Sequence, residues 1–190
     1  MTTDTDINIV SVCGSLRKGS FNAKLMRALP ALAPEGMRIT EAPSYAAVPL
    51  YNFDDQEANG FPHQADVWAD AIRSAHGFII VTPEYNWTIP GALKNVIDWA
   101  SRMKAQPFRG KPVAVQSASP GVLGGARAQF HMRECMTGVG ALPFGVPEVI
   151  VTFAGQKFDE KTGELKDDGT KDIVRKHLEG FGKFVRMVTH

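Results

Sequence analysis

Short apolar runs alternate with segments of helical period along the chain. The runs rich in β-branched residues, which predict strands, cover residues 7–13, 37–40, 77–82, 112–118 and 146–153. The segments that predict helices cover residues 22–32, 63–74, 91–104, 126–137 and 171–189. Because predicted strands and helices alternate, the pattern indicates an α/β domain built on a parallel sheet.

The apolar character of the strands indicates that helices lie on both faces of this sheet. The runs INIVSV, GFIIVT and PVAVQS are almost continuously apolar, as expected for strands that are covered on both sides. The last predicted helix carries a broad apolar stripe that should cover one face. This stripe consists of Ile173, Val174, Leu178, Phe181, Phe184, Val185 and Val188.

The segment GQKFDEKTGELKDDGT, at positions 155–170, interrupts this alternation. It is polar and rich in turn-forming residues, so it predicts a surface excursion that either covers a site or only decorates the surface. No repeat, linker or change of composition divides the chain. We therefore expect residues 1–190 to form a single domain.

Composition and charge exclude several classes of protein. The chain has 190 residues, of which 44% are hydrophobic and 22% charged, which is typical of a globular protein. Its net charge of +1 provides no general attraction to nucleic acid or to an anionic membrane. The N-terminus lacks the pattern of a secretory signal, and no apolar run approaches the roughly 18 residues of a membrane span. We expect a cytoplasmic protein with no nucleic-acid partner and no membrane insertion.

The cysteines and histidines predict neither a disulfide framework nor a metal site. Cys13 and Cys135 are far apart in the sequence, no C-x-x-C motif is present, and the histidines are scattered without metal-ligand spacing. Both thiols are interpreted as reduced and buried.

Three loops that follow predicted strands are rich in polar residues, glycine and proline. They are GSLRKGSFN at 14–22, PEYNWTIPG at 83–91 and SASPGVLGGAR at 117–127. In an open parallel sheet, the ligand lies at the carboxyl ends of the strands, near the point where the strand order reverses. We therefore expect the three loops to form one site.

The first loop has the composition of a phosphate site. It offers the hydroxyls of Ser15 and Ser20, the amide of Asn22, the guanidinium of Arg17 and glycines that let backbone N–H groups converge at the start of a helix. It lacks the Lys of an ATP-binding P-loop, and the C-x5-R spacing of a cysteine phosphatase would need Arg at position 19, where Gly19 stands. Taken alone, the loop could equally be an ordinary turn capped by Ser20.

The second loop combines aromatic residues with a proline-rich turn. Its backbone amides and the rings of Tyr85 and Trp87 could face a flat ligand, or both rings could pack in the core of a rigid turn. Glu84 has no His or second carboxylate beside it in the sequence, so the support for an acid–base role is weak.

The third loop contains glycines that permit a close approach of the main chain to a planar group. These are Gly121, Gly124 and Gly125, and Arg127 follows them as a candidate ligand for an anionic substrate or a partner subunit, or as a solvated helix charge. A phosphate at the first loop and a planar heteroaromatic ring between the second and third match the shape of flavin mononucleotide (FMN).

In this order and spacing, GSLRKGSFN, PEYNWTIPGALKNVIDWASR and SASPGVLGGARAQ resemble the motifs of the NAD(P)H-dependent FMN reductase family. This family includes bacterial chromate and quinone reductases and some azoreductases. The resemblance covers residues 7 to about 152. It implies a flavodoxin-like fold, that is, a doubly wound five-stranded parallel sheet of order 2-1-3-4-5 with FMN at the strand ends. It also implies a homodimer or homotetramer with the flavin near the subunit interface.

The resemblance implies a set of cofactor-binding residues. The pattern G-S-x-R-x-x-S-x-N implies four phosphate ligands, the pattern P-E-Y-N implies four residues that face the flavin ring, and two residues of the third loop match contacts to its far edge. The neighbours Phe21 and Trp87 complete the candidates. In order, the motif residues are Ser15, Arg17, Ser20, Asn22, Pro83, Glu84, Tyr85, Asn86, Ser117 and Gly121.

The helix that follows the third loop is a candidate for the partner interface. Its sequence ARAQFHMRECM could present Phe130, Met132, Cys135 and Met136 to another subunit, although a core-facing stripe explains most of these residues equally well.

The resemblance implies an FMN-dependent oxidoreductase. NADH or NADPH would give a hydride to the flavin, and a small-molecule acceptor would then take the electrons in a ping-pong sequence without a catalytic side chain. Candidate acceptors are quinones, free flavins, ferric chelates, chromate and azo compounds. The alternatives are an electron-transfer protein without nicotinamide oxidase activity and a module that binds another phosphorylated small molecule.

Overall fold

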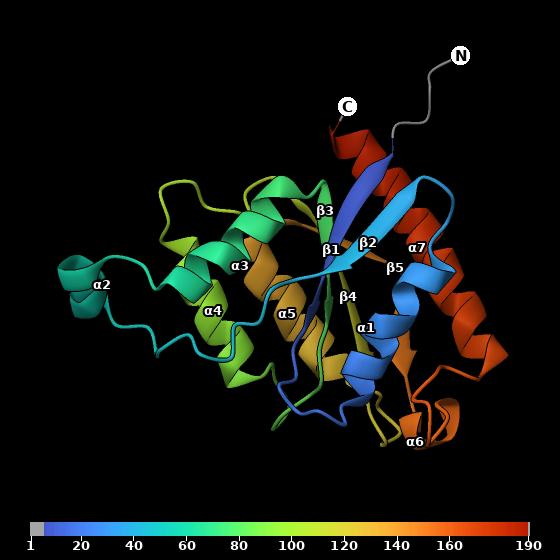
Figure 1. Ribbon diagram of the computed structural model, residues 1–190. Helices are drawn as coiled ribbons and strands as arrows, with labels where there is room; N and C mark the ends of the chain where they lie inside the picture. Colours follow the sequence, from blue (N-terminus) through green and yellow to red (C-terminus); the bar gives the residue numbers. More distant parts are fainter. Residues whose placement is uncertain (1–5, 190) are drawn as a thin grey trace, which may run out of the picture.

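The computed structural model describes residues 6–189, whose strands form a five-stranded parallel sheet of order β2-β1-β3-β4-β5 (Figure 1). The expected strand order, 2-1-3-4-5, is therefore confirmed. The order reverses between β1 and β3, which pair directly with each other. The strands are β1 (Ile7–Cys13), β2 (Met37–Glu41), β3 (Gly77–Val81), β4 (Pro112–Ala118) and β5 (Leu142–Val151).

Helices cover both faces of the sheet, as predicted. In Figure 1, α1 (Phe21–Leu32) and α7 (Asp168–Thr189) lie on one side. The other side carries α3 (His63–Ser74), α4 (Gly91–Ser101) and α5 (Ala126–Gly138). Two buried clusters fill these layers, one around Phe78, Trp68 and Trp99 and the other around Ile79, Leu29 and Phe181.

The fifth strand begins four residues earlier than predicted. Leu142 to Phe144 pair with Pro112 to Ala114, and the register then shifts before Gln116 pairs with Val149. The sequence hid this first half, because Pro143, Gly145 and Pro147 interrupt the apolar pattern. Proline and a register irregularity are tolerated here because β5 is an edge strand.

Four helix boundaries differ from the prediction, of which the end of α5 at Gly138 is one residue later than predicted. Helix α1 includes Phe21, since the side chain of Ser20 accepts the backbone N–H groups of Asn22 and Ala23. Helix α4 ends at Ser101 rather than at Lys104, because the next two amides bond to carbonyls only three residues back. Helix α7 starts at Asp168 instead of at 171.

Two short helices were not predicted. Helix α2 (Phe53–Asn59) contains no buried residue, so it has no apolar period that would reveal it. Helix α6 (Ala154–Lys157) begins one residue before the stretch that was predicted as an irregular excursion and otherwise lies within it.

The 155–170 segment is anchored to the core. Phe158 and Leu165 are buried and form a β-bridge with each other. The Phe158 ring also stacks on the ring of Phe21 in α1, with 5.9 Å between the centroids. On helix α7, Val174, Leu178, Phe181 and Val185 are fully buried, whereas Ile173 is 47% exposed.

No helix within residues 6–189 is long and apolar enough to cross a membrane.

Candidate functional site

The three loops meet at the carboxyl ends of β1, β3 and β4, where they enclose a cavity of about 310 Å³. Eight of the predicted cofactor-binding residues line this strand-end cavity, together with three residues of the third loop. The lining consists of Ser15, Arg17, Ser20, Phe21, Asn22, Pro83, Glu84, Tyr85, Ala118, Ser119 and Pro120. The predicted residues Asn86, Trp87, Ser117, Gly121 and Arg127 are not part of it.

Polar side chains of the first loop are buried and held in place. The Ser20 hydroxyl caps helix α1 by accepting two backbone N–H groups. Its own O–H remains a donor, because a hydroxyl can accept and donate at the same time. The Ser15 hydroxyl accepts the Arg17 N–H at 3.3 Å and lies 3.3 Å from the Tyr85 hydroxyl. Ser15 thereby joins the first loop to the second.

Asn22 joins the first loop to the end of β4. Its amide nitrogen donates to the Ala118 carbonyl at 2.9 Å, and its amide oxygen accepts the Ala118 N–H at 2.8 Å. Only 3% of Asn22 is exposed. One N–H of this amide is left for a ligand, so the side chain mainly positions the loops.

Gly14 lets β1 and β3 approach each other closely. A Cβ atom at this position would lie 2.5 Å from the Thr82 Oγ1 and 3.0 Å from the Thr82 Cα. The Gly14 N–H donates to the Val81 carbonyl at 2.8 Å. A side chain at position 14 would therefore force the two strand ends apart.

Arg17 is the cation at the mouth of the strand-end cavity. Its guanidinium is exposed and donates to the Gly19 carbonyl at 2.8 Å. This bond uses one of five N–H donors, so the guanidinium can still bind an anion. The neighbouring Phe21 forms another part of the wall and is backed by Phe158.

The second loop forms a tight two-residue turn. Tyr85 and Thr88 exchange backbone hydrogen bonds of 2.9 and 3.1 Å. Asn86 and Trp87 between them both have positive φ angles, of 49° and 73°. This is the geometry of a turn that prefers Asn followed by Gly, so Trp87 occupies a strained backbone position. Tyr85 and Trp87 are 47% and 67% exposed, and the alternative that places their rings in the core is wrong.

Glu84 caps helix α5 from a distance in the sequence. One of its carboxylate oxygens accepts the backbone N–H groups of Arg127 and Ala128, at 3.0 and 3.4 Å. The other lies 3.3 Å from the Arg127 guanidinium. A carboxylate at a helix N-terminus is stabilising, and these contacts give Glu84 a structural role.

Arg127 links this carboxylate to the exposed turn. Its guanidinium carbon lies 4.0 Å from the centroid of the Trp87 ring, which is a close cation–π contact. The interpretation of Arg127 as a solvated helix charge is therefore incomplete, because the side chain holds Trp87 against α5.

Glycines shape the third loop. Gly124 and Gly125 have φ angles of +59° and +94°, and a Cβ at Gly125 would lie 2.8 Å from the Ser117 Cβ. Ser117 is fully buried, and its hydroxyl accepts a hydrogen bond of 2.8 Å from the Gln129 amide. Gly121 is exposed beside this packed region.

The thiol of Cys13 is kept protonated. Burial raises its pKa, and the Sγ lies 3.4 Å from the Ser15 carbonyl, to which it can donate. Burial also raises the pKa of Tyr45, whose hydroxyl donates to the Cys13 carbonyl at 2.7 Å. These groups support the first loop and are not poised as nucleophiles.

Several residues around the cavity were missed by sequence reasoning. Thr82 packs on Gly14, Gln129 bonds to Ser117, and Ser119 and Pro120 line the cavity. Gln129 stands on the apolar side of a predicted helix, and a polar residue at such a position indicates a buried hydrogen bond. No group of three or more metal-ligating side chains is found in the part of the chain that the structure describes.

Comparison with known proteins agrees with the motifs. Residues 7–156 match the family model described as NADPH-dependent FMN reductase. A quinone reductase of Escherichia coli (strain K12) is 46% identical over 182 residues, which are 96% of this chain and 97% of the relative. An NAD(P)H-dependent FMN reductase of Pseudomonas aeruginosa is 40% identical over 95% of this chain and 96% of its own.

A solved structure shows the same arrangement of elements. The FerB flavoenzyme NAD(P)H:(acceptor) oxidoreductase of Paracoccus denitrificans superimposes with a TM-score of 0.85. It is 32% identical, and the match covers 95% of this chain and 98% of that chain.

Proposed function

Because the chain belongs to the NADPH-dependent FMN reductase family and is thus an NAD(P)H-dependent oxidoreductase with FMN as its cofactor, we propose that the strand-end cavity is its FMN site and that quinones are its acceptors. The observation that carries this proposal is the cavity itself. It lies at the point where the strand order reverses, and all three loops contribute to its wall.

The first loop has the chemistry to hold the phosphate of FMN. The Ser20 hydroxyl can donate, the Arg17 guanidinium has unused donors, and helix α1 begins at the cavity. Ser15 and Asn22 are already bonded to neighbouring loops and keep the first loop in this conformation. Burial of these side chains before binding reduces the entropic cost of ordering them.

The second and third loops would hold the flavin ring. Pro83, Glu84 and Tyr85 line the cavity, and Asn86 and Trp87 continue the same surface outward. Gly121 of the third loop offers an exposed backbone. Buried Ser117 would act through the third loop backbone, which its packing against Gly125 keeps in place.

When bound, FMN supplies the hydride chemistry between NAD(P)H and the acceptor. The chain would position the ring, and the exposed Tyr85 and Trp87 would offer flat surfaces to a planar donor or acceptor. We assign no acid–base residue, because the Glu84 carboxylate is engaged by the N-terminus of α5.

The acceptor and the kinetic order are part of the proposal. A quinone is favoured by the exposed aromatic surface and by the similarity to the quinone reductase of E. coli. Free flavins, ferric chelates, chromate and azo compounds are further candidates for an open site. NADH or NADPH would leave before the acceptor binds, which makes the reaction ping-pong.

We further propose a homodimer or homotetramer that places the flavin near a subunit interface. Among the four candidate residues of α5, Met132 and Met136 are fully buried and Cys135 packs against the core, which supports the core-stripe alternative for them. Phe130 is 60% exposed and remains the candidate contact. Sedimentation velocity should show a multimer that Phe130→Ser weakens, while a monomeric wild-type protein would contradict the proposal.

The cytoplasm is the proposed location, because both cysteines are free thiols.

The direct test is the visible spectrum of the purified protein, followed by steady-state kinetics. We expect flavin absorbance at one FMN per chain and sustained oxidation of NADH or NADPH with a quinone and no added protein. Double-reciprocal plots should be parallel. A colourless protein that does not take up FMN would refute the proposed site, and intersecting lines would refute the alternating use of one site.

A further inference from the structure

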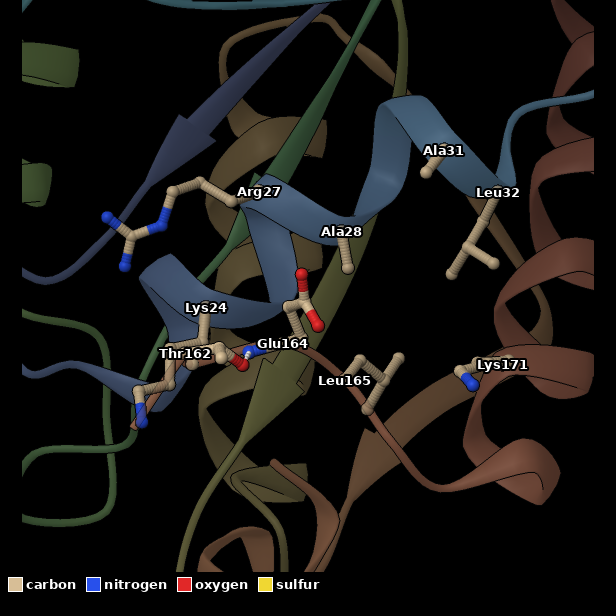
Figure 2. Close-up of a pocket in the computed structure, with 10 residues that line it drawn as sticks. Lys24, Arg27, Ala28, Ala31, Leu32, Thr162, Glu164, Leu165 and Lys171 are labelled. Atoms are coloured by element: carbon tan, nitrogen blue, oxygen red, sulfur yellow. Dashed lines mark hydrogen bonds between the residues drawn. The ribbon is translucent and has the colours of Figure 1, made fainter. Parts of the chain in front are cut away.

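A second cavity, of about 400 Å³, lies between helix α1, the hairpin of the 155–170 segment and the first turn of α7 (Figure 2). None of its described lining residues is shared with the strand-end cavity. Its volume falls within the range of small-molecule sites. The lining consists of Lys24, Arg27, Ala28, Ala31, Leu32, Thr162, Gly163, Glu164, Leu165 and Lys171.

The floor of this hairpin cavity is apolar. Ala28, Ala31 and Leu32 come from one side of α1, and Leu165 faces them from the hairpin. The stem of Lys24 adds to this surface where it passes Gly163, since a Cβ at that glycine would lie 3.4 Å from the Lys24 Cε. An apolar group that entered here would be removed from water on several sides.

Charge is distributed unevenly along the hairpin cavity. Lys171 extends from α7 toward Leu165, whereas Glu164 extends from the hairpin toward helix α1 (Figure 2). The Lys171 ammonium pairs with the exposed Asp168 at 2.9 Å. An ammonium has three donors, so it can accept a second anionic partner. The α7 end therefore favours a negative head group, and the Glu164 end disfavours one.

The other two cations have different surroundings. The Lys24 ammonium lies 5.6 Å from the centroid of the Phe21 ring, and the side chain of Arg27 extends away from Lys171 (Figure 2). They add to the positive potential of a lining with three basic residues and one acidic residue.

We propose that the hairpin cavity binds a small amphipathic carboxylate, with its head at Lys171 and its compact apolar body along Ala28, Ala31, Leu32 and Leu165. A single ammonium at one end of an apolar floor fits a monocarboxylate better than a phosphate ester, which usually recruits a helix N-terminus or a guanidinium fork. The site is separate from the proposed FMN site and does not depend on it.

The test is calorimetric titration of the FMN-loaded protein with octanoate and, separately, with phenylpropionate, which distinguishes an alkyl from an aryl body. At least one should bind saturably at one site per chain. Octanol and octylamine should bind far more weakly, because they lack the negative head.

Charge variants test the orientation of the ligand. Lys171→Gln should weaken binding about three- to tenfold, Lys171→Arg should retain it, and Glu164→Gln should strengthen it. The matched control is Lys176→Gln, which removes an exposed lysine of the same helix that does not line the cavity and should leave binding unchanged.

Filling the hairpin cavity tests its location. Ala31→Leu adds volume at an exposed helix position where Leu is a good helix former, so it should abolish binding while the thermal unfolding midpoint stays close to wild type. The proposal is overturned if neither carboxylate binds saturably at millimolar concentration. It is equally overturned if binding is insensitive to Lys171→Gln and Ala31→Leu, or if octanol binds as well as octanoate.

Discussion

The first and second loops meet at the same cavity, yet they differ in how their side chains are held. In the first loop, Ser15, Ser20 and Asn22 are buried and hydrogen-bonded to neighbouring backbone or side chains. In the second, Tyr85 and Trp87 are exposed on a turn with two positive φ angles. Under the proposed function, the first loop is pre-organised for the phosphate of FMN, whereas the second would present a flat surface to substrates that bind and leave in turn.

If the proposed function is correct, the first loop determines how tightly FMN binds and the second determines how readily substrates reach it. Charge-assisted contacts to side chains that are already fixed give high affinity, because few side chains have to be ordered on binding. An exposed aromatic turn contributes less to stability and leaves the site open. Substitutions in the two loops should therefore have distinct effects.

The largest expected effect comes from closing the space that Gly14 leaves. Gly14→Ala places a methyl group against the backbone and hydroxyl of Thr82 and should lower the free energy of unfolding by about 1–3 kcal/mol, with loss of FMN. Urea denaturation and flavin content measure both. Gly19→Ala is the control, because nothing lies within 4 Å of its Cβ. Equal behaviour of the two variants would contradict the proposed close packing.

Removal of Arg17, the cation at the mouth of the strand-end cavity, should affect the affinity for FMN more than the free energy of unfolding. Arg17→Ala is expected to weaken FMN binding about ten- to a hundredfold, since a hydrogen bond to a charged group contributes about 1.5–3 kcal/mol. Fluorescence titration of the apoprotein with FMN measures it. Arg38→Ala, which removes an exposed arginine of β2, should bind FMN as the wild type does. Unchanged affinity of Arg17→Ala would rule out Arg17 as a phosphate ligand.

The cap that joins the second loop to α5 should have an intermediate effect. Glu84→Gln keeps an acceptor but removes the charge from the helix N-terminus, so we expect a loss of about 1 kcal/mol in the free energy of unfolding. Chemical denaturation at low and high salt measures the loss, which should shrink as salt screens the charge. The exposed Glu134→Gln of the same helix is the control. A loss that does not depend on salt would argue against the electrostatic explanation.

The smallest stability effect is expected at the exposed turn. Trp87→Gly relieves about 1 kcal/mol of left-handed backbone strain and loses a cation–π contact of about 0.5–1 kcal/mol, so stability should change by less than about 0.5 kcal/mol. The KM for a planar quinone should nevertheless rise, and Trp87→Tyr should restore it. A KM that Trp87→Gly leaves unchanged would show that the ring plays no part in acceptor binding.

The bounds of a strand or helix could be predicted from the sequence where a single local pattern covers the whole element. The bounds of β1, β4 and α3 agree with the predicted ranges, because their apolar runs or helical period are uninterrupted. The first half of β5 was missed, because its prolines and Gly145 look like breakers in a single sequence and are tolerated only at a sheet edge.

The candidate site also has a part that could be predicted from the sequence and a part that could not. The motifs and their neighbours predicted twelve cofactor-binding residues, of which eight line the strand-end cavity. They did not predict that Glu84 would cap α5 or that Trp87 would stack against Arg127, because these partners are about forty positions apart in the sequence. The hairpin cavity was not foreseen either, since the segment that closes it looks only polar and irregular.

The sequence by itself determined the alternation of strands and helices, the three strand-end motifs and the family to which they belong. These properties depend on local periodicity and on residues close together in the chain. Only the tertiary structure decided which polar atoms are free to bind a ligand. Asn22 bonds to Ala118 and Ser15 contacts Tyr85 across separations of 96 and 70 residues, and such pairings exist only once the chain is folded.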